Sequence, residues 1–494
     1  MTARISPRWL IRGGHGSGHR EPDRPSLVTS EGLRYLALAV STDDRNPTSG
    51  SDAGVIARYS DLFAQRTGSM TSSAMRDLMS ITARPEVISL AGGLPDTSTF
   101  PPESWASLMQ GIAAERLASA LQYGPTEGHP DARDSAVTVM RHEGIEVDPD
   151  DILMTTGGQQ GLDLVCKILV DPGDVIIAEG PTYPGAITAF NAYEPRVEHV
   201  LTDEDGMDPA ALREKLAELD GEGARIKFLY LIPNFQNPSG VTLSEERRRE
   251  IVKIAQEREL LIVEDNPYSL LRFEGEPIPS MLEIDGGESV IYLGTFSKIL
   301  SPGIRLGWIT GPRPVLDKFN LAKQGADLCS SSLSQHFVSS YLNSGNWPDY
   351  MTSLRRIYTS RRNAMIESLE SEMPAGTTWT KPQGGLFIWA TLPEYIDTTD
   401  LLARALRENV AFVPGRAAWT NGMGSSSMRL NFSGVGEDRI REGIGRIASV
   451  ASEQVDLYET MMGRPSAKPK AEVQEDQGAK IVPLPTRRAA GESR

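Results

Sequence analysis

The sequence predicts an α/β fold built on a doubly wound, mainly parallel sheet. Short apolar runs, rich in β-branched and large residues, alternate along the chain with segments of helical periodicity. Strands covered by helices on both faces have this continuously apolar character, and strand–helix–strand repetition produces a parallel sheet. The length of 494 residues is enough for one large domain of this kind and a smaller one.

The predicted strands are short, and each is followed by a turn or a polar segment. In chain order they span residues 174–179, 226–232, 260–264, 290–293 and 306–310, all interpreted as strands of a parallel-type sheet. A later strand is predicted over residues 425–432. The sheet therefore lies in the first two thirds of the chain, and a separate strand lies near its end.

Helices are predicted between these strands. The clearest spans residues 244–257, where Ile251, Ile254 and Ala255 recur at helical spacing. Thr242 and Glu245 fit a T-x-x-E capping box at its start. A second helical run, residues 162–170, follows a segment with the sequence TTGGQQG, residues 155–161, which we call the glycine-rich loop.

The composition excludes several classes of protein. The chain has 50 Lys and Arg against 66 Asp and Glu, and this net charge of −16 argues against a nucleic-acid partner. No stretch approaches the ~20 apolar residues of a membrane span, and no export signal is recognised. The two cysteines, Cys166 and Cys329, cannot form a disulfide framework, which favours a cytoplasmic setting. No Cys/His cluster has metal-ligand spacing, so no metal site is predicted.

Polar side chains follow three consecutive predicted strands. In chain order they are Asn237, Asp265, Tyr268, Thr295, Ser297, Lys298 and Arg305. Open α/β sheets bind ligands beyond the carboxyl ends of their strands, so these groups are expected to converge at one edge. Such convergence predicts an active site.

Pyridoxal 5'-phosphate (PLP) is a cofactor that uses all of these groups. The amine of Lys298 can form a Schiff base with its aldehyde. The carboxylate of Asp265 can raise the pKa of the ring nitrogen and keep it protonated. Asn237 and Tyr268 can donate hydrogen bonds to the ring oxygen.

The cofactor phosphate needs hydroxyls, a cation and backbone donors. Thr295, Ser297 and Arg305 supply the first two. The glycine-rich loop before a helix lets backbone N–H groups approach an anion. Its predicted contacts are Gly157, Gly158 and Gln159. Tyr183, just after the strand at residues 174–179, can stack on the ring.

The ordered motifs resemble those of the class I and II aminotransferases, PLP-dependent enzymes of fold type I. They are YGPTEG at 123–128, TGGQQG at 156–161, NPSG at 237–240, DNPY at 265–268, TFSK at 295–298 with Arg305, and RLNF at 429–432. Each motif is weak alone, but the ordered set is specific and covers about residues 70–450. Thr295 stands where many relatives have serine, and the hydroxyl is kept.

The resemblance implies a domain organisation. Residues 1–50 are predicted to be a disordered extension, or alternatively an overlong start to the reading frame, and residues 463–494 a disordered tail, because neither segment has a sustained apolar period. An N-terminal arm and helix then span 51–100, the large PLP-binding domain spans 101–330, and a small C-terminal α+β domain spans 331–462.

The resemblance also implies roles for single residues. Lys298 resembles the Schiff-base lysine that moves the substrate α-proton, Asp265 the partner of the ring nitrogen, and Tyr268 a donor to the ring oxygen. Arg429 resembles the clamp for the substrate α-carboxylate. Tyr123 resembles a tyrosine that reaches the phosphate of the neighbouring subunit, which implies a homodimer with shared active sites.

Two segments are most similar to the 2-aminoadipate aminotransferase group, itself similar to aminotransferases for aromatic and branched amino acids and for kynurenine. They are SLAGGLP at 89–95 and PNFQNP at 233–238. Substrate contacts are implied for Gly93, for Asn237, and for Arg76, which matches an arginine that binds a side-chain carboxylate. The implied reaction moves the amino group of such an L-amino acid to a 2-oxo acid such as 2-oxoglutarate.

Simpler interpretations stay open for several residues. Lys298 and Arg76 are alternatively solvated surface groups, Asp265 a helix cap, Arg429 a residue on a solvated edge strand, and Tyr183 a core aromatic. Two other functions also remain. One is a transcription regulator with an aminotransferase-like sensing domain, and the other is a PLP enzyme that decarboxylates or eliminates.

Overall fold

The computed structural model describes residues 59, 62–70, 78, 82 and 84–463. The predictions for residues 1–50, for Arg76 and for residues 464–494 lie outside this part of the chain. The helices, strands and contacts named below all lie within these residues.

An eight-stranded sheet forms the centre of the larger part of the fold. Its strands, in spatial order, are β2 (Leu153–Thr155), β9 (Gly307–Thr310), β8 (Val290–Thr295), β7 (Leu261–Asp265), β6 (Ile226–Leu231), β3 (Val175–Gly180), β4 (Arg196–Asp203) and β5 (Gly206–Met207). The five predicted strands are all present. Every residue of β3 is buried, as expected of an apolar strand covered on both faces.

The prediction that all five strands run parallel is wrong for one of them. The pairs β3–β4, β3–β6, β6–β7 and β7–β8 are parallel, but β9 is antiparallel to both β8 and β2. An apolar run specifies burial and not strand direction, so the sequence pattern could not reveal this reversal.

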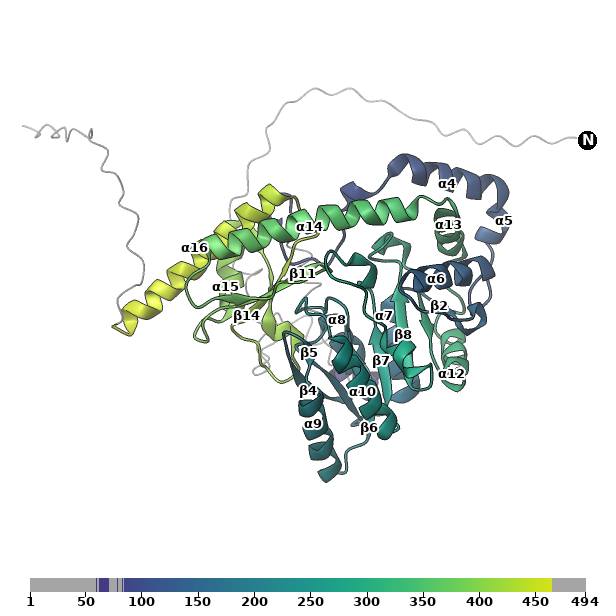
Figure 1. The fold of residues 1–494 in the computed structure, drawn as a ribbon, viewed down its shortest axis with the longest axis horizontal. Coiled ribbons are helices and arrows are strands. Elements are labelled where there is room, and N and C mark those ends of the chain that lie inside the picture. The colour runs from purple at the N-terminus through teal and green to yellow at the C-terminus, as the bar shows by residue number, and fades with distance from the viewer. Residues whose placement is uncertain (1–58, 60–61, 71–77, 79–81, 83, 464–494) are drawn as a thin grey trace, which may run out of the picture. The chain divides into compact units, whose positions relative to one another are not determined.

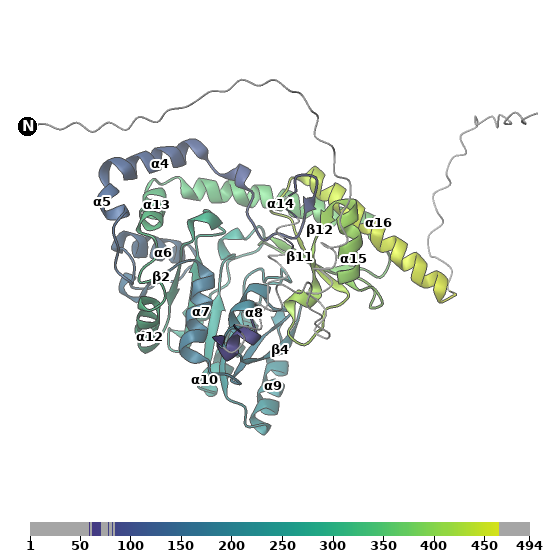
Figure 2. The same ribbon diagram turned by 180° about the vertical axis from the view of Figure 1, so that it is seen from behind.

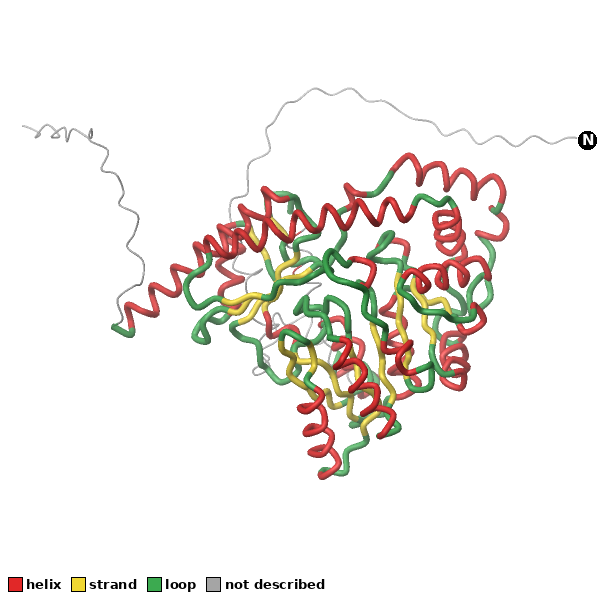
Figure 3. Tube along the Cα trace, in the orientation of Figure 1, coloured by secondary structure: helices red, strands yellow, loops and turns green. Residues whose placement is uncertain are grey.

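Helices cover both faces of the large sheet. On one face, α7 (Gly158–Leu169) contacts α8 (Pro184–Asn191) and α12 (Arg313–Gln324). On the other, α10 (Glu245–Glu257) contacts α9 (Pro209–Gly221) and α11 (Met281–Asp285). Figure 1 shows α10 in front of the strands and Figure 2 shows α7 there, and Figure 3 shows the alternation of helices and strands in this region. The arrangement is the doubly wound sheet that the sequence predicts.

Two predicted helix starts need correction. The residue that caps α10 is Ser244, while the Thr242 hydroxyl accepts a hydrogen bond at 3.4 Å from the backbone N–H of Phe235, so Thr242 and Glu245 do not form the predicted capping box. Helix α7 begins at Gly158, four residues before the predicted helical run at 162–170. The glycines hid this turn because glycine is a poor helix former in sequence patterns.

A four-stranded antiparallel sheet forms the C-terminal part. Its order is β10 (Thr378–Trp379), β11 (Phe387–Thr391), β14 (Ser427–Asn431) and β13 (Val413–Pro414). The strand predicted at 425–432 is β14, which lies between two neighbours. Three helices belong to this part: α14 (Trp347–Glu372), α15 (Thr398–Ala405) and α16 (Glu437–Met461).

An early segment of the chain joins this C-terminal part. The short strand β1 (Ile88–Ser89) pairs in parallel with β12 (Val410–Ala411). The backbone of Leu90 continues the contact: its N–H donates to Ala411, and its carbonyl accepts from Asn431, both at 2.8 Å. Residues 88–91 are thereby fixed beside β14.

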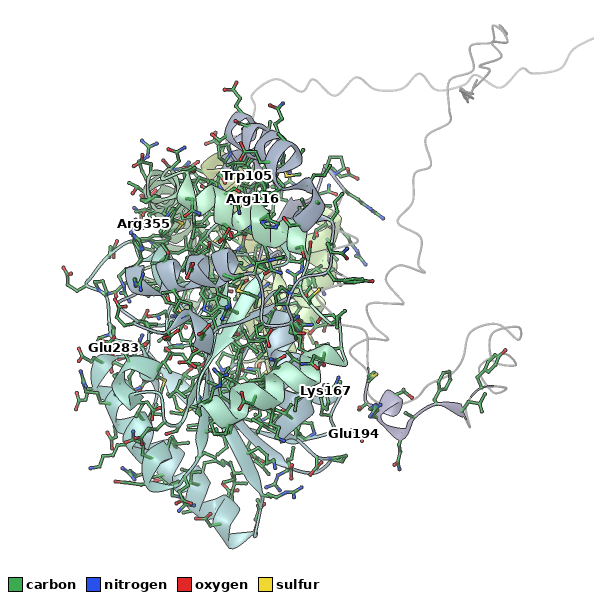
Figure 4. The ribbon with its side chains drawn as sticks, turned by 90° about the vertical axis from the view of Figure 1, so that its right-hand side faces the viewer. Trp105, Arg116, Lys167, Glu194, Glu283 and Arg355 are labelled. Atoms are coloured by element: carbon green, nitrogen blue, oxygen red, sulfur yellow. The ribbon has the colours of Figure 1, made fainter. Side chains whose placement is uncertain are left out.

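The remaining helices complete the fold. They are α4 (Pro102–Glu115), α5 (Leu117–Ala120), α6 (Pro130–His142), α13 (Ser332–Asn343) and the 3₁₀ turns η2 (Gln65–Gly68), η3 (Thr97–Thr99), η4 (Pro149–Asp151), η5 (Ser269–Leu271), η6 (Pro302–Ile304), η7 (Leu406–Glu408) and η8 (Gly415–Ala418). Figure 4 labels Lys167 and Glu194 on the side where residues 62–70 lie, and there the Ser69 hydroxyl donates to the Asn191 carbonyl at 2.8 Å. Among the described helices, none combines the length and apolar character needed to cross a bilayer.

Candidate active site

The carboxyl ends of the central strands meet at one edge of the large sheet and enclose a cavity of about 210 Å³. Ten predicted site residues line it: Gly158, Gln159, Tyr183, Asn237, Asp265, Tyr268, Thr295, Ser297, Lys298 and Arg305. They come from the ends of β3, β6, β7 and β8 and from the start of α7. The convergence expected from the strand order is therefore present.

Lys298 follows β8, and its amine is hydrogen-bonded to the backbone. The Nζ atom donates a hydrogen bond at 2.6 Å to the carbonyl oxygen of Gly93. Burial of the amine, with smaller contributions from Arg429 and Arg305, lowers the pKa of Lys298 to about 8. A substantial fraction of this amine is neutral near physiological pH, and only the neutral amine can act as a nucleophile or a base.

Asp265 ends β7 and is only 9% exposed. Its Oδ2 atom accepts a hydrogen bond at 2.7 Å from the hydroxyl of Tyr230, on the neighbouring strand β6. Burial raises the pKa of Asp265 to about 6, although the bond from Tyr230 acts in the opposite direction. Asp265 is a strand residue that faces the cavity, so the helix-cap interpretation is wrong.

Arg429 connects the two sheets. It is 2% exposed on the inner strand β14, which contradicts the interpretation as a solvated edge residue. Its Nη1 donates to Oδ1 of Asn237 at 2.9 Å, and its Nη2 donates to the Ala91 carbonyl at 2.6 Å. Its guanidinium lies 4.4 Å from the ring centroid of Phe387. Burial lowers the pKa of Arg429 to about 10, so it remains a cation at neutral pH.

The loop that bears Asn237 is held by buried polar side chains that the sequence did not single out. Oε2 of Glu179 accepts hydrogen bonds from the backbone N–H of Ile232 at 2.9 Å and from Gln236 at 3.3 Å. From α10, the guanidinium of Arg248 donates to the Pro233 carbonyl at 2.8 Å. Asn237 in turn hydrogen-bonds Tyr268, whose phenol has its pKa raised by burial.

Several donors gather where α7 begins; we call the N-terminus of α7 with Thr295, Ser297 and Arg305 the donor cluster. The Thr295 hydroxyl donates to Oγ of Ser297 at 2.9 Å. Gly157, which precedes α7, has a φ of 76°, and a Cβ atom there would lie 2.6 Å from a guanidinium nitrogen of Arg305. No heavy atom lies within 4 Å of a Cβ built on Gly158, so the space beside the helix start is open.

The backbone packs closely beneath the donor cluster. A Cβ atom on Gly307 of β9 would lie 2.7 Å from the Gly294 carbonyl oxygen and 3.1 Å from the N–H nitrogen of Gly158. Glycine at 307 therefore permits the antiparallel strand β9 to lie against the start of α7.

The other predicted residues differ in where they lie: some are at the cavity, one is on the surface, and one is outside the described part of the chain. Tyr183 caps α8 and lines the cavity, and Gln159 donates to the Gly185 carbonyl at 2.9 Å. Tyr123 is 78% exposed and is not among the residues that line this cavity. Arg76 lies outside the described residues. Tyr230 is a site residue that sequence reasoning missed; a tyrosine within a buried strand, which needs a partner for its hydroxyl, was the available signal.

Comparisons with known proteins agree with this arrangement. Residues 85–447 match the model of the family described as aminotransferase class I and II. The chain is 43% identical over 398 residues to aromatic-amino-acid aminotransferase 1 of Thermococcus litoralis, covering 80% of this chain and 95% of that protein. It is 40% identical over 392 residues to 2-aminoadipate transaminase of Thermus thermophilus, covering 79% and 96% respectively.

A solved structure gives the same result. The kynurenine aminotransferase of Pyrococcus horikoshii, crystallised in complex with PMP, superposes with a TM-score of 0.77 at 41% identity, covering 82% of this chain and 100% of that one. The family model, the related sequences and the solved structure thus all indicate an aminotransferase. The chain belongs to the class I and II aminotransferase family, and it is a PLP-dependent aminotransferase of fold type I.

Proposed function

We propose that this enzyme transfers the amino group of an L-amino acid of the 2-aminoadipate, aromatic or branched-chain type to a 2-oxo acid such as 2-oxoglutarate. The observation that supports it most is the placement of Lys298 and Asp265 at one cavity, with Arg429 hydrogen-bonded to Asn237, which lines the same cavity. An amine that can carry a proton, a buried acid and a buried cation are the groups that this reaction requires.

The residues at this cavity fit PLP at each of its functional groups. The donor cluster offers hydroxyls, a guanidinium and a helix N-terminus, which together suit a phosphate. The open space over Gly158 leaves room for that anion. The acid at the other side, Asp265, is buried with its pKa raised, and a cationic ring nitrogen would stabilise its charged form.

Each remaining contact has a proposed task. Asn237 and Tyr268 would hydrogen-bond the ring oxygen, and Tyr183 would contact the ring face. Gly157, Gly158 and Gln159 would supply loop contacts to the phosphate. When bound, PLP supplies an aldehyde for the amino group and a ring that withdraws electrons from the substrate.

Lys298 is proposed to move the substrate α-proton. A base needs to be neutral when it accepts a proton, and the burial that lowers the pKa of Lys298, helped by Arg429 and Arg305, favours that form. The Gly93 carbonyl holds the free amine in one direction, 2.6 Å away.

Arg429 is proposed to bind the substrate α-carboxylate. Its planar fork suits a carboxylate, and its burial strengthens the interaction by excluding water. Asn237, which accepts a hydrogen bond from Arg429, orients the fork and contacts the substrate as well. Gly93 borders the substrate through its place beside Lys298.

The substrate class and the assembly are further parts of the proposal. The similarity to aromatic and 2-aminoadipate aminotransferases supports the donor types, and Arg76 is proposed to bind an acidic side chain. Tyr123, exposed on one chain, is proposed to reach the phosphate site of a second copy in a homodimer. The low cysteine content supports a cytoplasmic location.

A donor screen tests the proposal. Purified protein loaded with PLP is mixed with 2-oxoglutarate and, in turn, 2-aminoadipate, phenylalanine, leucine and kynurenine, and glutamate formation is measured. We expect glutamate from at least one donor and none from the Lys298→Ala variant. Release of carbon dioxide or ammonia in place of glutamate would assign another PLP reaction to the enzyme.

A further inference from the structure

Lys323, near the end of α12, is a lysine with 0% exposure. Lysine is almost never fully buried unless it is paired, because an unpaired buried ammonium is costly. Its Nζ donates to Oδ1 and Oδ2 of Asp327 at 2.8 and 3.0 Å, to Oε1 of Gln160 at 2.9 Å and to Oγ of Ser330 at 3.1 Å. The amine is therefore held by several acceptors.

The partners of Lys323 lead directly to the glycine-rich loop. Oδ2 of Asp327 accepts hydrogen bonds from the Thr156 hydroxyl at 2.8 Å and from Nε2 of Gln160 at 2.7 Å. The Oε1 atom of Gln160, which Lys323 contacts, also accepts the backbone N–H of Thr156 at 2.7 Å. Lys323 and Asp327 thus fix the residues on both sides of Gly157, Gly158 and Gln159.

The glycine-rich loop needs these hydrogen bonds because its own backbone is flexible. Gly157 has a positive φ and no side chain, so its backbone has more accessible conformations than that of any other residue type. The backbone N–H groups that follow it can serve an anion only if they point in one direction before the anion arrives. Neither Lys323 nor Asp327 lines the cavity, so any effect they have on a ligand is indirect.

We propose that Lys323 and Asp327 are positioning residues that hold the glycine-rich loop in the conformation that binds the cofactor phosphate. The inference rests on the proposed phosphate contacts of that loop. Lys323 and Asp327 are expected to affect the binding of the cofactor phosphate alone, and not the binding of its ring or its aldehyde.

The charge of the pair is consistent with this role. Burial acts to raise the pKa of Asp327, but hydrogen bonds from Lys323, Gln160 and Thr156 outweigh it and hold the pKa below its usual value. Asp327 is therefore a deprotonated carboxylate, and both of its oxygens can accept hydrogen bonds. The Thr156 hydroxyl and the Gln160 amide of the loop both donate to it.

The test compares PLP with pyridoxal, which lacks the phosphate. Apoprotein is titrated with each ligand, and the dissociation constants are compared for wild type, Lys323→Met, Asp327→Asn and the control Lys318→Met, an exposed lysine of the same helix. We expect both variants of the pair to weaken PLP at least about tenfold and pyridoxal less than about twofold. The control should change neither constant.

A second variant tests the same network if Lys323→Met does not fold. Should Lys323→Met fail to fold, Thr156→Val removes only one hydroxyl of the network and is expected to weaken PLP about threefold without affecting pyridoxal. Equal losses for PLP and pyridoxal, or unchanged PLP affinity in both variants of the pair, would overturn the positioning role while the proposed function stands. A wild-type protein that binds PLP no better than pyridoxal would overturn the phosphate contacts themselves.

Discussion

The amine of Lys298 and the carbonyl oxygen of Gly93 are 2.6 Å apart, although 205 positions separate them in the chain. Gly93 follows the segment that is hydrogen-bonded to β12 and β14, and Arg429 of β14 donates to Ala91 in the same segment. The proposed proton carrier on the large sheet and the proposed carboxylate clamp on the small sheet therefore contact one short piece of backbone. Changes at the clamp are expected to affect the direction of the amine.

Lys298→Ala should abolish turnover while PLP still binds without a covalent bond. A positioned acid–base group accelerates a reaction by about a hundredfold to ten-thousandfold. The turnover rate of the variant is therefore expected to be at least about a hundredfold lower than that of wild type. Borohydride treatment followed by mass spectrometry should attach the cofactor to wild type and not to the variant. Near-normal turnover in the variant would remove Lys298 from the reaction.

Capture of PLP by the apoprotein should follow the ionisation of Lys298. Because the pKa of this amine is lowered to about 8, its neutral form grows about tenfold per pH unit well below that value, reaches about half at pH 8 and is nearly complete by about pH 10. Stopped-flow absorbance should show a capture rate that rises about tenfold per pH unit below 8 and then levels. A rate still rising steeply at pH 10 would indicate an unshifted lysine.

Asp265→Asn should lower activity and stabilise the empty protein. Burial raises the pKa of Asp265 from 3.8 to about 6, so the native state keeps a proton that the unfolded chain loses between those values. Stability therefore falls as pH rises through that window, by about 3 kcal/mol in full. We expect the apo variant to gain about 2 kcal/mol in unfolding free energy at pH 7.5, since the weaker bond to Tyr230 offsets part of the gain.

Urea unfolding at two pH values checks this prediction. The gain should be present at pH 7.5 and nearly absent at pH 3.5, where the native carboxyl group is protonated and the unfolded one mostly so. Turnover of the variant loaded with PLP should fall about a hundredfold or more, since a charge that stabilises the reacting centre is lost. A stability gain that is the same at both pH values would exclude ionisation of Asp265 as its cause.

Arg429→Gln should raise the KM for amino acids about tenfold to a hundredfold, the value of one charge-assisted hydrogen bond. The PLP dissociation constant should change far less, because Arg429 does not contact the donor cluster and can reach the proposed cofactor contacts only indirectly, through Asn237. Steady-state kinetics and cofactor titration separate the two effects. An unchanged KM, or a loss confined to PLP affinity, would contradict the clamp.

Gly307→Ala should destabilise the fold by about 1–3 kcal/mol, because the added methyl would meet backbone atoms that cannot move aside easily. Gly111→Ala is the matched control: it lies within α4, and nothing lies within 4 Å of the new carbon. In that position alanine should stabilise by about 0.5–1 kcal/mol. Urea unfolding of both variants measures the difference, and a harmless change at 307 would show that β9 and α7 can separate.

The strand pattern was sufficient to predict which side chains meet at the cavity, because these residues directly follow buried strands. The strands that carry Asn237, Asp265 and Lys298 are continuous apolar runs, and their ends could be located closely. The strand β4 (Arg196–Asp203), next to the short edge strand β5, contains charged residues and is mostly part-exposed, so it gave no such signal. The very short β2 and the direction of β9 were equally inaccessible to pattern reasoning.

Partners across space were the part that sequence could not supply. Lys323 and Asp327, four positions apart near a helix end, have the pattern of an ordinary surface ion pair. Only the fold shows that the Lys323 side chain is completely enclosed and that its pair faces the glycine-rich loop. The hydrogen bond from Tyr230 to Asp265 likewise depends on the register between β6 and β7.

The reversal of β9 has a consequence for how this enzyme reaches its native state. Strand β9 runs antiparallel to β8, and α12 follows β9 in the chain. The stretch from residue 295 to residue 327 therefore passes the corner beside the start of α7 three times, at Ser297, Arg305 and Lys323. The contacts of Arg305 and Lys323 with the glycine-rich loop span 149 and 163 positions, fewer than the 192 and 338 that separate Arg429 from Asn237 and Ala91, so they cost less loop entropy to form. The corner can assemble from one continuous stretch and the loop at 155–161, before the distant ends of the chain come together around Arg429.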